Sequence, residues 1–295
     1  MERRDFLNPK ILSPFKRFEM MAHSVVEGFI SGSHKSPYKG LAIEFAEHRQ
    51  YVPGDDIKHL DWKVLGKLDR YYIKQYEEDT ALRAYLLLDV SGSMGYRTGE
   101  YSKLDYGKYI CSVLTYLLTQ QCDSTSLITF DSEIVHRLPL RSTVKHLKRI
   151  NDVLRDASPG NETSMGAVLH SLATMTKRRA LVVIVSDFFD DIKAITRALN
   201  HFAHKKHEIV VFQVHDRKEV EFPFKDLTKF TSLENDEIIL ADPMRLKKEY
   251  LKQFNQHQEQ LKKCCFQLKI DYVPMYTDIP FAFAMAKYLA GRLRR

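Results

Sequence analysis

One short segment of the chain combines residue types that can bind a cation. Asp89, Ser91 and Ser93 alternate in the sequence LLLDVSGSM. The aliphatic residues before Asp89 are typical of a buried strand, and the small residues after it are typical of a turn. A carboxylate and two hydroxyls are hard oxygen donors, which suit Mg²⁺ or Mn²⁺. The segment therefore predicts a metal-binding turn at the carboxyl end of a strand, where open α/β sheets bind their ligands.

Two later loops can complete this site. Thr163 lies just before an expected helix in PGNETSMGAVL, and Asp187 directly follows the most hydrophobic strand in ALVVIVSDFFD. Because loops at the carboxyl ends of parallel strands meet at one edge of the sheet, both can reach Asp89. The predicted metal ligands are Asp89, Ser91, Ser93, Thr163 and Asp187. A shell so rich in uncharged hydroxyls leaves the cation electrophilic, with a position that a carboxylate from another molecule can fill.

The same residues also have a purely structural interpretation. Asp89 and Asp187 can cap strand-to-helix turns, and Thr163 can cap the helix that follows it. The two serines can satisfy turn backbone with their hydroxyls. A DxSxS string alone is weak support for a metal site, whereas its position after a strand and the two matching loops favour one.

The elements that must position these residues form a regular pattern from about residue 80 onward. Short buried strands alternate with amphipathic helices, which predicts a doubly wound α/β fold with a mostly parallel sheet. Strands are expected at 84–90, 126–130, 133–138, 180–187, 208–215 and 267–273. Helices are expected at 107–121, 144–156, 165–179, 192–205, 244–266 and 280–295. Only two residues separate 126–130 from 133–138, so this pair is a hairpin and supplies one antiparallel edge strand.

Residues 1–79 have a different pattern and are predicted to form an α+β extension to a domain at 80–295. A helix is expected at 11–30, a turn-rich segment follows it, and short strands are expected at 41–45 and 71–78.

Composition predicts an ordinary globular chain of the cytoplasm. Of its 295 residues 44% are hydrophobic and 28% charged, and no stretch suits a secretory signal or is long enough to span a membrane. The four cysteines lack CxxC spacing, which indicates reduced structural thiols. The net charge of +7 is spread over short clusters without a nucleic-acid-binding motif, so no nucleic-acid partner is expected.

Two further groups of polar residues invite a site and have simpler explanations. His201, His204 and His207 are spaced by three, but no cysteine or carboxylate completes a set of zinc ligands, which favours a solvated helix end. Asp187, Asp190 and Asp191 together suggest a second carboxylate site or a general acid–base pair, but Asp187 is assigned to the metal, and the position of the other two before residue 192 favours capping of the next helix.

The metal-site motifs resemble a known arrangement. DVSGSM, the threonine loop and VSD are similar to the metal-ion-dependent adhesion site of von Willebrand factor A domains, which implies a von Willebrand factor A-like, Rossmann-like sheet. The upstream segment EFAEHRQYVPGDDIKHLDWKVLGKLDRYYIKQYEED resembles the signature of the bacterial domain-of-unknown-function family 58. The matching positions are Glu44, Phe45, Arg49, Tyr51, Pro53, Gly54, Asp55, Asp56, Asp61 and Trp62. With YTDIPFAFAMAKYL near the end, the resemblance covers nearly the whole chain.

The resemblance implies partners and also shows one departure. Family members are often encoded beside MoxR-type AAA+ ATPases, which implies such a partner in the assembly or maturation of other proteins. Longer members carry membrane helices before this region, and this chain resembles a short member without them. Family members usually have a glycine-rich loop where Asn161 and Glu162 stand here, so Glu162 can add a carboxylate near the metal. The role of Arg49 to Trp62 stays open between a structural turn and a partner surface.

These observations favour a non-enzymatic, metal-dependent protein–protein interaction module, in which a partner supplies an acidic residue to Mg²⁺ or Mn²⁺. The alternative is a metal-dependent hydrolase or phosphotransferase that uses the same site. The sequence contains no GxxxxGK[ST] phosphate loop and no nucleophile elbow, which favours the binding function.

Overall fold

The computed structural model describes residues 44–51, 64, 66, 71–77, 82–160, 164–233 and 238–293. The predicted helix at 11–30, most of the segment from Arg49 to Trp62, Glu162 and Thr163 lie outside these residues. The chain divides into two compact units, one of Ser36–Ala81 and one that contains Leu82–Arg295.

The described part of the smaller unit is a two-stranded antiparallel sheet. Its strands are β1 (Glu44–Gln50) and β2 (Tyr72–Glu77), with a register shift after Phe45. The amide of Tyr51 donates to the carbonyl of Tyr71 at 2.9 Å, which extends the pairing by one step. The second strand lies where the sequence predicts it, whereas the first runs to Gln50, beyond its predicted end at residue 45.

The larger unit contains a six-stranded sheet in the order β10-β7-β6-β3-β4-β5. The strands are β3 (Arg83–Asp89), β4 (Ser124–Phe130), β5 (Ile134–Arg137), β6 (Leu181–Ser186), β7 (Glu208–His215) and β10 (Asp271–Tyr276). All neighbours are parallel except β4 and β5, whose antiparallel pairing places β5 at one edge. Counted along the chain the order is 3-2-1-4-5-6, which is that of doubly wound folds. The predicted fold class is confirmed.

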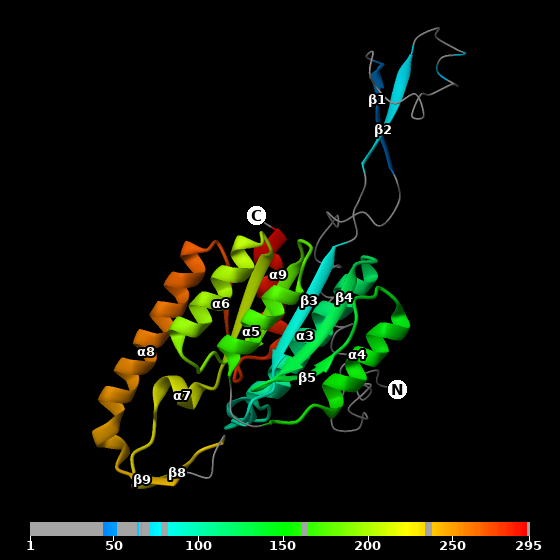
Figure 1. The fold of residues 1–295 in the computed structure, drawn as a ribbon. Coiled ribbons are helices and arrows are strands. Elements are labelled where there is room, and N and C mark those ends of the chain that lie inside the picture. Colours follow the sequence, from blue (N-terminus) through cyan, green and yellow to red (C-terminus); the bar gives the residue numbers. More distant parts are fainter. Residues whose placement is uncertain are drawn as a thin grey trace, which may run out of the picture. The chain divides into compact units, whose positions relative to one another are not determined.

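Helices cover both faces of this sheet (Figure 1). On one face α3 (Lys103–Gln120), α4 (Val144–Asp156) and α9 (Phe281–Leu293) share an apolar cluster with the strands. On the other face lie α5 (Met165–Met175), α6 (Ile192–His204) and α8 (Pro243–Gln267). Successive residues of a strand point to opposite faces, so Leu86 and Leu88 enter the first cluster and Leu87 enters the second. A strand buried on both sides reads as a continuous apolar run, which made the central strands predictable.

Several element boundaries differ from the sequence predictions for local reasons. The helix α3 starts at Lys103, before the expected residue 107, because Ser102 and Asp105 form a capping box. The last strand starts at Asp271, because α8 continues to Gln267 and Lys269 then takes a left-handed φ of 56°.

Three short elements between β7 and α8 were not predicted. They are α7 (Arg217–Glu221), β8 (Thr228–Thr231) and β9 (Ile238–Ala241), and β8 pairs antiparallel with β9. Elements of four or five residues are too short to show a hydrophobic period in the sequence.

Within the described residues, no helix combines the length and apolar character needed to cross a membrane.

Candidate functional site

The predicted site lies where the order of strands reverses. Asp89 is the last residue of β3, and Asp187 directly follows β6, the strand parallel and adjacent to β3. From β3 the chain continues to β4 on one side, whereas β6 and β7 lie on the other side. The carboxyl ends of such diverging strands form the crevice in which doubly wound folds bind ligands. The fold therefore brings Asp89 and Asp187 to one place.

Asp89 is fully buried, and hydrogen bonds hold both of its carboxylate oxygens. The amide of Ser91 donates to its Oδ1 at 2.9 Å, and the hydroxyl of Ser186 donates to its Oδ2 at 2.6 Å. Burial, with the nearby charge of Asp187 adding to it, raises the pKa of Asp89 to about 7. The negative charge is thus costly at this position in the absence of a cation.

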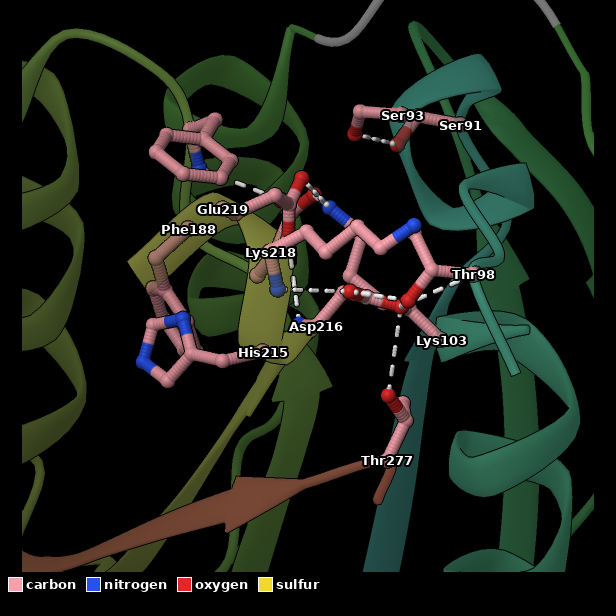
Figure 2. Close-up of polar contacts among 12 residues, drawn as sticks. Ser91, Ser93, Thr98, Lys103, Phe188, His215, Asp216, Lys218, Glu219 and Thr277 are labelled. Atoms are coloured by element: carbon pink, nitrogen blue, oxygen red, sulfur yellow. Dashed lines mark hydrogen bonds and ion pairs between the residues drawn. The ribbon is translucent and has the colours of Figure 1, made fainter. Parts of the chain in front are cut away.

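The two serines of the motif connect the carboxylates. Ser91 is buried, Ser93 lies in the 3-10 turn η3 (Gly92–Gly95), and their Oγ atoms are 3.2 Å apart (Figure 2). The hydroxyl of Ser93 also reaches the carboxylate of Asp187, where its hydrogen bond lowers the pKa of that carboxyl. Four of the five predicted ligands therefore converge: Asp89, Ser91, Ser93 and Asp187.

Asp187 has contacts on both carboxylate oxygens. The amide of Phe189 donates to Oδ1 at 3.2 Å, and the ammonium of Lys103 donates to Oδ2 at 2.7 Å. Burial raises the pKa of Asp187, but the charge and hydrogen bond of Lys103 oppose burial and hold the pKa below its usual value. Asp187 is therefore an ionised carboxylate with a cation already beside it.

Lys103 is the main residue of the site that the sequence analysis missed. It is fully buried at the first position of α3, and its Nζ lies 2.7 Å from both Asp187 Oδ2 and Glu219 Oε1. Burial lowers the pKa of its ammonium, but the two carboxylates outweigh burial and raise the pKa above its usual value. The only sequence signal is a lysine in the first turn of a helix, where the helix dipole disfavours a positive charge.

Glu219 belongs to a second cluster, which meets the predicted metal ligands at Lys103. It is the third residue of α7 and forms a capping box with Asp216. The hydroxyls of Thr98 and Thr277 both donate to Asp216, at 2.6 Å and 3.4 Å (Figure 2). Asp216 therefore joins the loop after the serine turn to the ends of β7 and β10.

Thr163 and Glu162 lie outside the described residues, and their part in the site stays a prediction. Hydrogen bonds anchor the described residues that precede and follow them. The amide of Gly160 donates to the carbonyl of Val90 at 2.6 Å, and the amide of Gly166 donates to Asp190 Oδ2 at 3.2 Å. Both flanks are thus bonded to the same edge of the sheet as Asp89.

The aspartates after the site have different roles. Asp191 caps α6 as predicted, since its side chain accepts from the amide of Lys193. Asp190 is not itself the capping residue that was predicted: its Oδ1 accepts from the amide of the cap residue Asp191 at 2.6 Å, and its Oδ2 accepts from the amide of Gly166 in α5.

The histidines near residue 204 do not form one solvated group. His204 is exposed, but His207 is buried beside Phe202, so that part of the prediction is wrong. His201 lies against His170 of α5, with 3.3 Å between their Nδ1 atoms.

The chemistry of the converging donors suits a hard divalent cation. Two carboxylates and two hydroxyls offer oxygen ligands of the kind that Mg²⁺ and Mn²⁺ prefer. In the part of the chain that the structure describes, no group of three or more His, Cys, Asp or Glu side chains is arranged to hold a metal. Lys103 already shares one of the two carboxylates of the hydroxyl-rich set.

A doubly wound sheet in this strand order, with an antiparallel third strand and a DxSxS turn after the first, has the fold that the resemblance to von Willebrand factor A domains implies. The model of the family described as "Protein of unknown function DUF58" matches residues 47–260, and the chain belongs to this family.

Known proteins of two kinds resemble the chain. Uncharacterized proteins of Mycobacterium tuberculosis and Mycobacterium bovis are 26% identical over 226 residues, which cover 76% of this chain and 71% of theirs. The crystal structure of the conserved hypothetical protein BatB from Bacteroides thetaiotaomicron matches 73% of this chain and 100% of its own, with 15% identity and a TM-score of 0.48. The SpRpn10 VWA domain matches 46% of this chain and 76% of its own, with 13% identity and a TM-score of 0.33.

Proposed function

We propose that this protein is a non-enzymatic interaction module that binds a partner protein through a divalent metal ion. The ligands would be Asp89, Ser91, Ser93, Thr163 and Asp187, and the ion Mg²⁺ or Mn²⁺. The observation that carries the proposal is the convergence of two buried carboxylates and two hydroxyls at the switch point of the sheet. A bound cation would supply an electrophilic position for a partner's carboxylate.

The residues of this chain have distinct parts in such a site. Asp89 is held in place by Ser186 and the amide of Ser91, so its orientation does not depend on the cation. The serine hydroxyls add oxygen donors without adding charge. Because Lys103 already offsets the charge of Asp187, an acidic partner residue would complete the ligand set.

The proposed partner is an acidic surface, and the family resemblance points to a MoxR-type AAA+ ATPase. Together they would act in the assembly or maturation of other proteins. The hydrolase alternative needs a base free to act beside the cation. Lys103 and Glu219 are instead paired with each other, and His215 faces Gln258 at 3.1 Å, so we favour binding over catalysis.

Affinity capture from native lysate tests the proposal. Wild-type protein and Asp89→Ala would each be used in Mg²⁺ and in chelator, and retained proteins identified by mass spectrometry. Asp226→Ala, at an exposed position after α7, serves as the matched control. We expect a partner retained by wild type and the control in Mg²⁺ only, and lost in Asp89→Ala.

Identical retention in all conditions would contradict the metal-dependent mechanism. Turnover of a phosphoester or amide substrate that requires Mg²⁺ and Asp89 would instead establish the enzymatic alternative.

A further inference from the structure

We propose that Lys103 is a built-in cation that weakens metal binding at Asp187 and thereby makes the site depend on a partner's acidic residue. The inference rests on the proposed function and names the regulation of the same site. It comes from one observation, a fully buried ammonium that contacts a predicted metal ligand at 2.7 Å.

The pairing of Lys103 with Asp187 is tight and shielded from water. The side chain of Lys103 is 0% exposed and that of Asp187 is 2% exposed. Charges interact far more strongly in such surroundings than at the surface. A divalent cation near Asp187 would therefore meet both a partly neutralised ligand and a positive charge fixed behind it.

Glu219 opposes this effect from the other side of the ammonium. Its Oε1 accepts from Lys103 Nζ at 2.7 Å, and 15% of its side chain is exposed. The two carboxylates therefore share one ammonium. When a cation binds Asp187, the ammonium of Lys103 can remain paired with Glu219. Without Glu219, Lys103 would pair with Asp187 alone.

This sharing connects the metal site to the elements after β7. Glu219 lies in α7, where its other oxygen accepts from the amide of Asp216 at 3.1 Å. Its backbone carbonyl accepts from the hydroxyl of Tyr250 in α8 at 3.1 Å. Glu219 thus connects the proposed metal site, through its side chain, with the contact between α7 and α8, through its backbone carbonyl.

The rings around Lys103 restrict where its ammonium can go. The Nζ atom lies 5.2 Å from the ring centre of Phe189 and 5.8 Å from that of Tyr96. Aromatic faces attract an ammonium, so the two rings help to keep the charge between its carboxylates.

Two variants distinguish the effect of the ion pair between Lys103 and Asp187 from the effect of the protein's net charge. Lys103→Met combined with Glu219→Gln removes one charge of each sign, so the net charge of the protein is unchanged while Asp187 is released. Glu219→Gln alone keeps the ammonium of Lys103 and leaves Asp187 as its carboxylate partner. Lys108→Met is the matched control, because Lys108 is a second buried lysine of α3 whose Nζ donates to the carbonyl of Ala157 instead.

The measurement is the dissociation constant of Mg²⁺ and of Mn²⁺ for the full chain, by calorimetry and by electron paramagnetic resonance of Mn²⁺. We expect the double variant to bind about tenfold or more tightly than wild type, since the cation no longer meets a fixed ammonium. Glu219→Gln should bind several-fold more weakly, and Lys108→Met should differ from wild type by less than about twofold. Thermal unfolding in chelator checks that each variant is folded.

The outcomes distinguish this inference from the proposed function. Wild type that binds Mg²⁺ with no tighter binding in the double variant would overturn the role of Lys103 and leave the proposed function standing. Metal binding by the double variant alone would support Lys103 as the excluding cation and contradict a metal-dependent wild type. If neither binds, both proposals fail. Should the double variant not fold, Glu219→Gln decides alone, since equal or tighter binding would overturn the inference.

Discussion

At the scale of single residues, the hydroxyl of Ser186 performs two tasks in the buried end of β6. It donates to Asp89 Oδ2 at 2.6 Å and accepts from the amide of Phe188 at 2.8 Å. The second bond matters for the backbone, because Phe188 has a positive φ of 61°. Ser186 thus holds both a predicted metal ligand and the turn that carries Asp187.

We expect Ser186→Ala to destabilise the protein by about 1–3 kcal/mol, since it leaves a buried amide and a carboxylate oxygen without their partner. Urea unfolding followed by circular dichroism measures the change. Ser171→Ala, on the exposed side of α5, should stay within about 0.5 kcal/mol of wild type. Equal stability of the two variants would mean that the hydroxyl of Ser186 is replaced by water.

The lowered pKa of His215 makes the stability of the protein depend on pH. Burial, assisted by the charge of Lys103 and opposed by that of Asp187, lowers the pKa of His215 from 6.5 to about 4. A group with a lowered pKa in the folded state binds fewer protons there than in the unfolded chain between these values. The stability it contributes is therefore complete above pH 6.5 and is lost as the pH falls toward 4.

Relative to His215→Gln, wild type should lose roughly 3 kcal/mol of unfolding free energy between pH 7 and pH 4. Denaturant titrations of both proteins at several pH values give the difference curve, in which contributions from other groups cancel. His204→Gln, at an exposed position of α6, is the control and should follow wild type. A flat difference curve for His215→Gln would show that the ring is not kept neutral by burial.

Much of the candidate site could be predicted because its signal is local. Asp89, Ser91 and Ser93 lie within five residues, and Asp187 ends an apolar run of its own. Lys103 and Glu219 could not be predicted in the same way. They are 116 residues apart in sequence and meet only because α3 and α7 follow strands on opposite sides of the switch point.

At the scale of elements, the packing of α5 against α6 depends on one glycine. A Cβ atom added at Gly166 would lie 2.5 Å from the Cβ and 3.1 Å from the carbonyl carbon of Ala194. The same residue donates its amide to Asp190, in the loop that leads from β6 to α6. Close approach of the two helices thus positions the first turn of α5, which follows Thr163 in the sequence.

Gly166→Ala should destabilise the protein by about 1–3 kcal/mol, because the backbone of α6 must move. The better helix propensity of alanine offsets part of this cost, by up to about 1 kcal/mol. Gly291→Ala in α9 has open space around its Cβ and should be neutral or stabilising. Calorimetric unfolding of the pair tests the contrast, and the same sign for both would contradict the close packing of α5 and α6.

Helices and strands were predicted well where a buried face gives a repeating apolar pattern in the sequence. They were predicted poorly where the element is too short to show such a pattern. The helix α4 has the expected bounds, 144–156, because its apolar face repeats clearly and Thr143 caps it. The elements α7, β8 and β9 were missed, because four or five residues are too few to show a hydrophobic period, and the capping box of Asp216 and Glu219 is the only local signal for α7.

At the scale of the whole molecule, the fold gathers its buried charged residues at one edge of the sheet. Asp89, Lys103, Asp187, Asp216 and Glu219 gather at the carboxyl ends of β3, β6 and β7, within or beside the core. Even when they are paired, buried charges often stabilise a fold less than well-packed apolar residues would, so this edge lowers stability relative to an apolar alternative. A site retained at such cost is typical of function.

Linkage between metal binding and folding follows from this arrangement. A cation that binds only the folded protein stabilises it by about 1.4 kcal/mol at ten times its dissociation constant, which corresponds to a rise of a few degrees in Tm. We expect this rise for wild type in Mg²⁺ and its absence in Asp89→Asn.

In chelator, Asp89→Asn should be at least as stable as wild type, because the side-chain amide of Asn can accept from the backbone amide of Ser91 and donate to Ser186 while a buried charge is removed. Differential scanning calorimetry of both proteins, with and without Mg²⁺, measures all four values. A variant less stable than wild type in chelator would mean that Asp89 serves the fold, whereas equal rises in Mg²⁺ would place the cation elsewhere on the molecule.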